Sequence, residues 1–554
     1  METTEKRRSA NKPTITRLKF SEDEKGKPIS SFQGYKVKPC NMGTSCPHCQ
    51  GVFDLTRYIG KKGPKRPKVM IFTDDVKHSK GEPFLVAHKS TPDEVRVTQT
   101  LPSFTERLLG RKQKGVTPVS IVTLGGMPFR GGSCTAYWNH ETDTIIIIDY
   151  GRKVKNQTQD LDEAGKQKKW EIDPFELPYE DFLVQYRDKI QGIIVTHLHI
   201  DHCGALPYIP EEIKDILVCL TPLCYLTVKS MCEMAETPEP ENMVIFQPGD
   251  KIADLSGFKV KSFPLLHSAL ETVGFDIRAG NQRILHFGDF NLAGLNQQER
   301  ETQNKLFDEL IKEGQIDCLT FDAVGAAREG KRLYEERIYT DIEKIIAEAP
   351  GRVIIPIFSS SIGRIQKLIE IAEKHGRRAT PWGNAMETSW RNASKLGYLK
   401  TTMKTSDLTV TELLDSSKEV AFVTGGQAEP GAQLTKSAFG DERSNLRLRH
   451  DDLIAFCQDP IPGNEKRVQG LDNRLTEDGY EITRNGNNGL VTHVSGHNLQ
   501  GDLDDFFTQF RRYTRLFYPQ HMSSRTWEIV EERYGSKYNL ITPKFKERTP
   551  LWEQ

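Results

Sequence analysis

The sequence predicts an α/β protein in which short buried strands alternate with helices. Two observations support this prediction. Several runs of strand length end directly at a polar residue: Ile190–Thr196 is β-branched and ends at His197, and Arg283–Phe287 ends close to Asp289. Helix-length segments lie between such runs, and Tyr334–Ala349 is one of them. Short strands that end in functional residues and alternate with helices are typical of layered α/β folds.

The other elements of this first region follow from the same patterns. A helix is expected over Glu211–Ala235. Further strands are expected at short β-branched or apolar runs, namely Val119–Leu124, Thr144–Ile148, Phe258–Leu266 and Cys318–Phe321.

Residues 326–480 are expected to form a second α/β unit. The helix at Tyr334–Ala349 leads into the buried-strand pattern Val353–Phe358, and another strand is expected at Ala421–Thr424. Ser359 to Ser361 are predicted to cap a helix, because serine side chains accept hydrogen bonds from the first helical N–H groups.

Composition and charge limit the function classes. Apolar residues make up 37% of the chain and charged residues 27%, which suits a globular protein with real cores. Lys plus Arg and Asp plus Glu are both 76, so overall charge does not indicate a nucleic-acid partner. The N-terminus has no apolar signal core, and no apolar run reaches the roughly 18 residues of a membrane helix. Most of the 10 cysteines are scattered, and together these features favour a cytoplasmic protein without membrane association.

The strongest chemical signal is a compact cluster of metal-ligand residue types that follows a predicted strand. His197, His199, Asp201 and His202 occupy four of six consecutive positions. On an extended loop the alternating histidines can point to one side, and the pair that follows can reach a second metal. Imidazoles with a carboxylate suit zinc. Three further candidate ligands are His267 and Asp289, each at the end of another predicted strand, and His521 in the segment Tyr518–Met522.

These motifs resemble those of the metallo-β-lactamase superfamily and, within it, the β-CASP nucleases, with the ribonuclease J family as the nearest match. The resemblance spans roughly residues 119–535. Asp149 matches the superfamily's first motif. The segments that carry the match to ribonuclease J are Thr196–Tyr208 (THLHIDHCGALPY), His267–Gly274 (HSALETVG), Thr424–Pro430 (TGGQAEP) and His493–His497 (HVSGH).

The resemblance implies an αββα metallo-β-lactamase sandwich with an inserted α/β β-CASP domain. The predicted segments are a disordered tail over 1–30, an N-terminal extension over 31–115, the first part of the sandwich over 116–325, the β-CASP domain over 326–480 and the return of the sandwich over 481–554. The active site is expected in the cleft between the two domains.

The resemblance also implies roles for individual residues. Two catalytic zinc ions are expected at His197, His199, Asp201, His202, His267, Asp289 and His521, with Asp201 counted as catalytic too. Asp322 and His497 match further catalytic positions, with His497 as a general acid oriented by Asp322. His493 and Ser495 match positions that hold the substrate phosphate, and Arg364 matches a segment near the RNA channel. For Asp322 and Arg364 the alternative is an ordinary helix cap or salt bridge.

The expected function is that of a zinc-dependent ribonuclease acting on single-stranded RNA, as a 5′–3′ exonuclease, an endonuclease or both, in RNA processing or decay. The family carries His at the position of His521 in RNA-acting members. One alternative is a DNA nuclease or small-molecule hydrolase of the same superfamily. Another is a catalytically dead RNA-processing scaffold. The seven filled ligand positions argue against it, because dead members of the family lose metal ligands.

The N-terminal extension holds a weaker motif. Cys40, Cys46 and Cys49 include one CxxC knuckle, which alone suggests a zinc ribbon and a third, structural zinc ion. The alternative is that these cysteines are reduced and bind no metal, because no second knuckle is present. Protein partners are expected to act through this extension. The chain ends soon after His521, so the sequence leaves the family's usual dimer open.

Overall fold

The structure is a computed structural model, and it contains two compact units, Met1–Gln113 and Lys114–Gln554. In the second unit it describes residues 118–126, 131–153, 174–252, 255–402, 416–461, 463–543 and 545–551. In the first unit it describes the backbone of the strands alone.

The N-terminal unit contains an antiparallel sheet with strand order β1-β8-β7-β6-β5-β4, beside a short β2-β3 pair. Strand β1 (Thr14–Lys19) lies within the predicted disordered tail, where Thr14, Ile15 and Thr16 favour a strand that pairs with β8. Cys40, Cys46 and Cys49 lie outside the described residues. The other strands are β2 (Ser21–Glu22), β3 (Pro28–Ile29), β4 (Ser31–Phe32), β5 (Tyr35–Lys38), β6 (Val69–Thr73), β7 (Phe84–Thr91) and β8 (Glu94–Thr100).

The second unit is built on two packed sheets. The larger one has seven strands in the order β14-β13-β12-β11-β10-β9-β25, and it is parallel from β11 to β14. Its strands are β9 (Val119–Gly125), β10 (Cys134–Asn139), β11 (Thr144–Ile148), β12 (Ile190–Ile194), β13 (Leu217–Leu220), β14 (Asn242–Ile245) and β25 (Arg548–Pro550). Helices α3 (Glu180–Gln185), α4 (Ile200–Cys203) and α5 (Pro222–Ala235) occur in the connections between these strands.

The smaller sheet has five strands in the order β15-β16-β17-β18-β24. They are β15 (Lys259–Pro264), β16 (Val273–Ala279), β17 (Gln282–His286), β18 (Ile316–Asp322) and β24 (Thr514–Gln520). The helices on its outer face are α6 (Gln297–Lys312), α13 (Gln500–Phe510) and α14 (Ser524–Tyr534).

Alternation along the strands explains how the two sheets pack. Ile146 and Ile148 on β11 belong to the core between the sheets, together with Ile277 and Ile284 of the smaller sheet. The intervening β11 residues, Ile145 and Ile147, belong to the core under the helices. Successive side chains of a strand point to opposite faces, so a strand buried on both faces has an uninterrupted run of isoleucines.

The outer face of the smaller sheet packs against a cluster of phenylalanines. Phe287 lies beside Phe506 of α13, with ring centroids 5.2 Å apart and nearly perpendicular planes. Phe307 of α6 joins the same cluster. With helices outside both sheets, the predicted αββα sandwich is confirmed.

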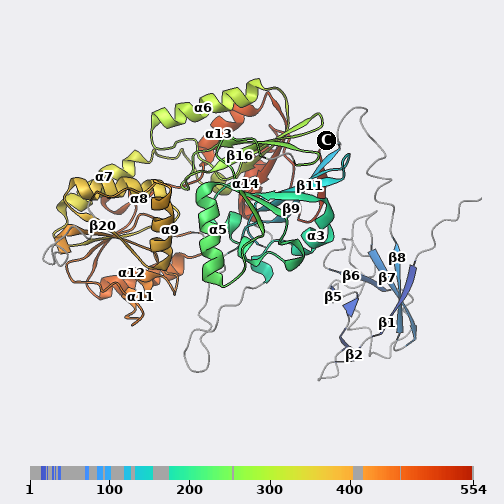
Figure 1. Cartoon of the computed structure of the whole chain (residues 1–554), viewed down its shortest axis with the longest axis horizontal. Coiled ribbons are helices and arrows are strands. Elements are labelled where there is room, and N and C mark those ends of the chain that lie inside the picture. Colours follow the sequence, from blue (N-terminus) through green and yellow to red (C-terminus); the bar gives the residue numbers. More distant parts are fainter. Residues whose placement is uncertain are drawn as a thin grey trace, which may run out of the picture. The chain divides into compact units, whose positions relative to one another are not determined.

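A third sheet forms a separate parallel α/β layer, called here the inserted unit. Its strands follow the order β20-β21-β19-β22-β23, and Figure 1 shows its helices around the sheet. The strands are β19 (Val353–Pro356), β20 (Arg378–Trp382), β21 (Glu419–Val423), β22 (Leu453–Ala455) and β23 (Glu481–Thr483). The helices are α7 (Glu336–Glu348), α8 (Ile362–Lys374), α9 (Asn384–Lys395), α11 (Gln433–Ala438) and α12 (Glu465–Glu477).

The topology shows that this unit is an insertion. The chain leaves the smaller sheet at the end of β18, forms the inserted unit and returns to the same sheet as β24, which pairs in parallel with β18. The pairing places Asp322 opposite Gln520, next to His521. Two candidate catalytic residues are thus neighbours because of the return. The domain boundaries given above stay predictions.

Two local predictions are wrong. The helix expected over Glu211–Ala235 is interrupted by strand β13, and α5 begins only at Pro222. A four-residue apolar run such as Leu217–Leu220 does not distinguish helix from strand, and proline at a first helical position marks the start. Ser361 precedes α8 as expected, but its side chain makes no capping hydrogen bond.

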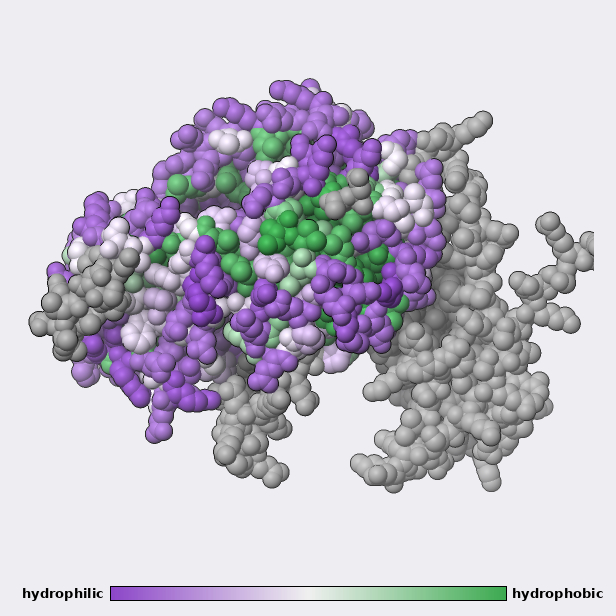
Figure 2. Space-filling view, viewed as in Figure 1, coloured by the Kyte–Doolittle hydropathy of each residue, from purple (hydrophilic) through white to green (hydrophobic). Residues whose placement is uncertain are grey.

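The described surface is mostly polar on the face in view. Figure 2 shows hydrophilic residues over most of it, with hydrophobic ones gathered where Figure 1 places β9, β11 and β16. Among the residues described, no helix combines the length and apolar character that a membrane crossing requires.

Candidate metal centre

The predicted ligands meet at the ends of strands from both sheets. Strand β12 ends at Ile194, and His197 follows in the loop. The sequence suggested an extended loop for all four clustered ligands, but Asp201 and His202 lie in the helical turn α4. Because this turn changes the direction of the chain immediately after His199, Asp201 and His202 reach a second group of ligand-type residues.

Asp149 holds this loop in place from the end of β11. It is 2% exposed, and its carboxylate accepts hydrogen bonds from the Thr196 backbone N–H at 2.7 Å and from the Thr196 hydroxyl. Its Oδ2 lies 2.7 Å from Nδ1 of His202. A carboxylate on one imidazole nitrogen fixes the ring so that the other nitrogen faces the ligand. Asp149 therefore orients His202, and only the family resemblance pointed to it.

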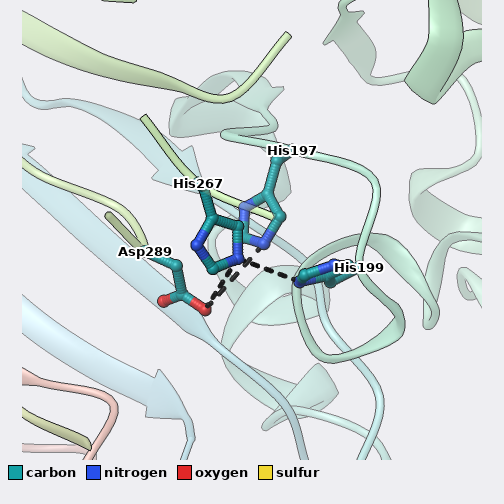
Figure 3. Close-up of side chains that lie close together, drawn as sticks. All are labelled: His197, His199, His267 and Asp289. Carbon is teal, nitrogen blue, oxygen red and sulfur yellow. Dashed lines mark hydrogen bonds and ion pairs between the residues drawn. The ribbon is translucent and has the colours of Figure 1, made fainter. Parts of the chain in front are cut away.

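The first group of ligand atoms consists of three histidines and a carboxylate. His197, His199, His267 and Asp289 offer atoms that all lie within 4.8 Å of one another. Nε2 of His267 is 3.2 Å from Nδ1 of His199, and Oδ2 of Asp289 is 3.9 Å from Nε2 of His197. Figure 3 shows the four side chains converging on one point.

A second group lies next to the first and shares Asp289. Asp201, His202, Asp289 and His521 again lie within 4.8 Å of one another. Nε2 of His202 is 3.3 Å from Oδ2 of Asp289, and Nδ1 of His521 is 2.8 Å from Oδ1 of Asp289. The structure thus brings together all seven residues predicted as metal ligands, and one carboxylate has an oxygen in each group.

Two buried nitrogens indicate that these groups fit metal ions. Nε2 of His197 and Nε2 of His202 are buried without an aligned hydrogen-bond partner among the described residues. A buried polar atom without a partner is costly, since it loses its hydration. A divalent cation would satisfy both atoms. The donor set of imidazole and carboxylate suits borderline metals such as zinc.

The charge states of the histidines agree with this interpretation. Burial lowers the pKa of His197 and of His267 well below the usual value, so both imidazoles are neutral, which is the form that binds a metal ion. Burial would also lower the pKa of His202 and His521, but nearby carboxylates, first of all Asp289, raise both well above it. Protons on these two rings balance the buried carboxylates, and a metal ion would take over that role.

His497 forms a close pair with Asp322 at the edge of the second group. Its Nδ1 lies 2.6 Å from Oδ2 of Asp322 and 3.9 Å from Oδ2 of Asp289. Burial would lower the pKa of His497, but Asp322 and then Asp289 raise it above the usual value. The pair therefore favours a protonated imidazole. Asp289, Asp322, His497 and His521 also lie within 4.8 Å of one another, so His497 as a ligand is the alternative role.

Two buried arginines and a partly buried glutamate hold the segment that carries His497. Arg332 donates from Nε to the carbonyl of Ser495, and Arg364 donates from Nη2 to the carbonyl of Val494 at 3.2 Å. Glu335 joins the two arginines, with its oxygens 2.7 Å from Arg332 Nη2 and 2.5 Å from Arg364 Nε. Arg364 lies on α8 of the inserted unit, so this network connects the segment that carries His497 with the inserted unit.

Arg364 contacts protein groups within this network. The residue is 4% exposed, and besides Glu335 its side chain contacts the carbonyl of Cys457 and Nδ1 of His493. These contacts favour the ion-pair alternative for Arg364 over a direct substrate contact. His493 is oriented by Arg364 and Cys457 together. Arg332 and Glu335 were missed in the sequence, where only their nearness to Asp322 could have suggested them.

Glu335→Gln is expected to lower the free energy of unfolding by about 3 kcal/mol, because it leaves two buried guanidinium groups without their shared carboxylate. Urea titration followed by circular dichroism measures this. Glu343→Gln is the matched control: Glu343 pairs with Lys374 on the surface, where an ion pair contributes under about 1 kcal/mol. Equal effects of the two variants would show that the buried network does not stabilise the fold.

Ser495 has a second arginine partner. Nη2 of Arg328 donates to Ser495 Oγ at 2.8 Å, and the backbone N–H of His497 donates to the same oxygen at 3.2 Å. Arg328 is exposed, unlike Arg332 and Arg364. The structure thus places both His493 and Ser495, the predicted phosphate-holding residues, in one segment beside the ligand groups.

Comparison with known proteins agrees with these motifs. A family model described as "Ribonuclease J, beta-CASP domain" matches residues 350–475, and one described as "Beta-lactamase superfamily domain" matches residues 173–332. Ribonuclease J of Mycobacterium tuberculosis is 30% identical over 413 residues, which are 74% of this chain and 69% of the relative. The predicted resemblance is therefore confirmed.

Other relatives match over a smaller share of their length. Ribonuclease J of Sinorhizobium meliloti is 32% identical over 60% of this chain and 58% of its own, and that of Thermus thermophilus is 30% identical over 70% and 65%. The chain thus spans about three fifths of these two relatives. A solved structure of a protein of unknown function from Enterococcus faecalis has a TM-score of 0.55 at 15% identity, covers 78% of this chain and all of its own, and shows the shared fold.

Proposed function

The chain belongs to the ribonuclease J family, and we propose on that basis that it is a zinc-dependent ribonuclease that hydrolyses phosphodiester bonds of single-stranded RNA. The observation that carries the proposal is the pair of adjacent ligand groups sharing Asp289. Two metal ions side by side are the arrangement that phosphodiester-cleaving enzymes use to hold the attacking and leaving oxygens. A scaffold without activity would have no need of seven ligands in this geometry.

The proposed chemistry divides between the ions and the chain. When bound, two divalent ions supply a water of lowered pKa and positive charge for the phosphate. His497 holds the proton for the leaving 3′-oxygen: its Nδ1 faces Asp322 at 2.6 Å, which leaves Nε2 to donate. Asp322 favours the charged imidazole, and Ser495 fixes the backbone of His497. Products would carry 5′-phosphate and 3′-hydroxyl ends.

The proposed substrate is RNA rather than DNA. His521 occupies the position at which RNA-acting members of the family carry histidine. The proposed compartment is the cytoplasm, because the described cysteines are free thiols, as a reducing environment keeps them. Both 5′–3′ exonuclease and endonuclease activity fall within this proposal.

Matched single strands of RNA and DNA test the function. RNA is expected to be cleaved at least about tenfold faster, the effect of one or two lost hydrogen bonds to 2′-hydroxyl groups. Each strand is given 5′-triphosphate, 5′-monophosphate or 5′-hydroxyl ends, and the product ends are mapped. DNA cleaved as fast as RNA would contradict the substrate proposal, and 3′-phosphate products would contradict the mechanism.

A further inference from the structure

We propose that Arg328 binds a phosphate group of the RNA strand next to the metal centre and thereby contributes to substrate affinity. The inference rests on the proposed function and assigns a binding role to a residue outside the recognised motifs. It starts from one contact, the 2.8 Å hydrogen bond from Nη2 of Arg328 to Ser495 Oγ. A guanidinium group presents several donors in a planar fork, so one used donor leaves others for a phosphate.

Arg328 differs from the neighbouring arginines in its pairing. Arg332 and Arg364 are buried and share Glu335. Arg328 is exposed and forms no ion pair with any carboxylate that the structure describes within 4.0 Å, although its charge acts on Asp459. Two arginines are therefore committed to holding the protein segment. Of the three arginines, Arg328 is therefore the one available to bind an anionic ligand.

The backbone on both sides of the contact is fixed close to the ligand groups. Arg328 ends the 3-10 turn η6 (Val324–Ala327), which follows strand β18 and Asp322, and its carbonyl accepts from the N–H of Gln500 at 3.0 Å. On the other side, the carbonyl after Ser495 accepts from Nδ1 of His267 at 3.0 Å. Ser495 is thus one residue from a contact with a metal-ligand side chain, at most about 4 Å along the chain.

This placement suits an adjacent phosphate of the same strand. The scissile phosphate would lie at the ligand groups, while Arg328 and Ser495 offer a cation and a hydroxyl beside them. Two kinds of phosphate share this chemistry: a 5′-terminal monophosphate and an internal phosphodiester. Both are anions that a guanidinium binds through paired hydrogen bonds. The test separates them.

Equilibrium binding of cleavage-resistant RNA provides the test, with phosphorothioate linkages that keep the backbone charge. Metal-loaded protein is titrated with such strands carrying a 5′-monophosphate or a 5′-hydroxyl, at several salt concentrations. Arg328→Ala should weaken binding about tenfold, as expected for a lost charge-assisted hydrogen bond. It should also reduce the slope of log affinity against log salt by about 0.7, the value for one phosphate contact on a single strand.

Two further variants make the result specific. Arg328→Lys should restore the salt slope but only part of the affinity, because lysine keeps the charge without the planar fork. Arg512→Ala is the matched control: Arg512 is exposed beyond the start of β24, about 20 Å from His521 at the other end of that strand. It should change neither quantity. Circular dichroism of each variant checks the fold.

The two RNA ends identify the phosphate. An effect of Arg328→Ala seen only with the 5′-monophosphate strand assigns Arg328 to the terminal phosphate, and an equal effect on both strands assigns it to an internal one. Wild-type binding with unchanged affinity and slope in Arg328→Ala would overturn the inference alone. Failure of the wild-type protein to bind either strand would instead overturn the proposed function.

Discussion

Asp289→Ala is expected to remove bound metal and activity together. Its carboxylate reaches both ligand groups: Oδ2 lies 3.9 Å from Nε2 of His197 in the first group, and Oδ1 lies 2.8 Å from Nδ1 of His521 in the second. One substitution therefore weakens both sites. A metal ion stabilises the transition state of phosphodiester hydrolysis by several kcal/mol, so activity should fall by about 10³–10⁵-fold. Elemental analysis of the purified variant should show that the zinc content of the metal centre falls from two ions toward zero.

The control for this variant separates metal loss from unfolding. Asp289 is 2% exposed, so Asp289→Asn, which keeps its shape, should be measured beside Asp289→Ala. Asp188→Ala is a surface control, because Asp188 is exposed and pairs only with its neighbour Arg187 among the described residues. A folded Asp289→Ala protein that retains both ions would show that the shared-carboxylate interpretation is wrong.

His497→Ala is expected to lower activity by about 10²–10⁴-fold while metal stays bound. The reason is that the leaving group is a sugar alkoxide, which needs a proton, and His497 is the imidazole whose pKa the Asp322 carboxylate raises. Asp322→Asn should have a smaller effect, since it removes the orienting charge and leaves the imidazole. Rates on RNA and metal content are measured for both variants.

A change of leaving group tests the role of His497 directly. A nitrophenyl phosphodiester has a leaving group that needs no proton, so His497→Ala should cleave it at close to the wild-type rate. His375→Ala, which alters the imidazole that follows the C-terminal end of α8 and pairs with Glu343, is the matched control. Loss of zinc in His497→Ala would make His497 a ligand, as its place in the third group of four ligand-type residues allows.

The sequence predicted the clustering of the candidate ligands better than it predicted the elements around them. Most of these residues follow short buried strands, and parallel strands end at a common edge. Strand β11 has the predicted bounds Thr144–Ile148. Helix and strand could not be separated where a short apolar run such as Leu217–Leu220 adjoins a helix. Strand β16 was missed because its first residues, Val273 and Gly274, belong to the motif that begins at His267.

The supporting residues around the ligands could not be predicted from local patterns. Glu335 joins Arg332, three residues away, to Arg364 on another helix, and only the fold brings the second pair together. The role of Asp149 depends on the pairing of β11 with β12, which sets its carboxylate beside Thr196. Contacts of this kind depend on tertiary packing, so no spacing rule in the sequence reveals them.

The return of the chain to the smaller sheet has a consequence for how the protein is made. His521 and Asp289 are in contact but 232 positions apart in the sequence. A nascent chain that has emerged from the ribosome only as far as the inserted unit already carries His197, His267 and Asp289, yet lacks both His497 and His521. Closing so long a loop comes late, because its entropy cost precedes the contacts that repay it. A half-made chain therefore lacks part of the proposed catalytic centre while it is still attached to the ribosome.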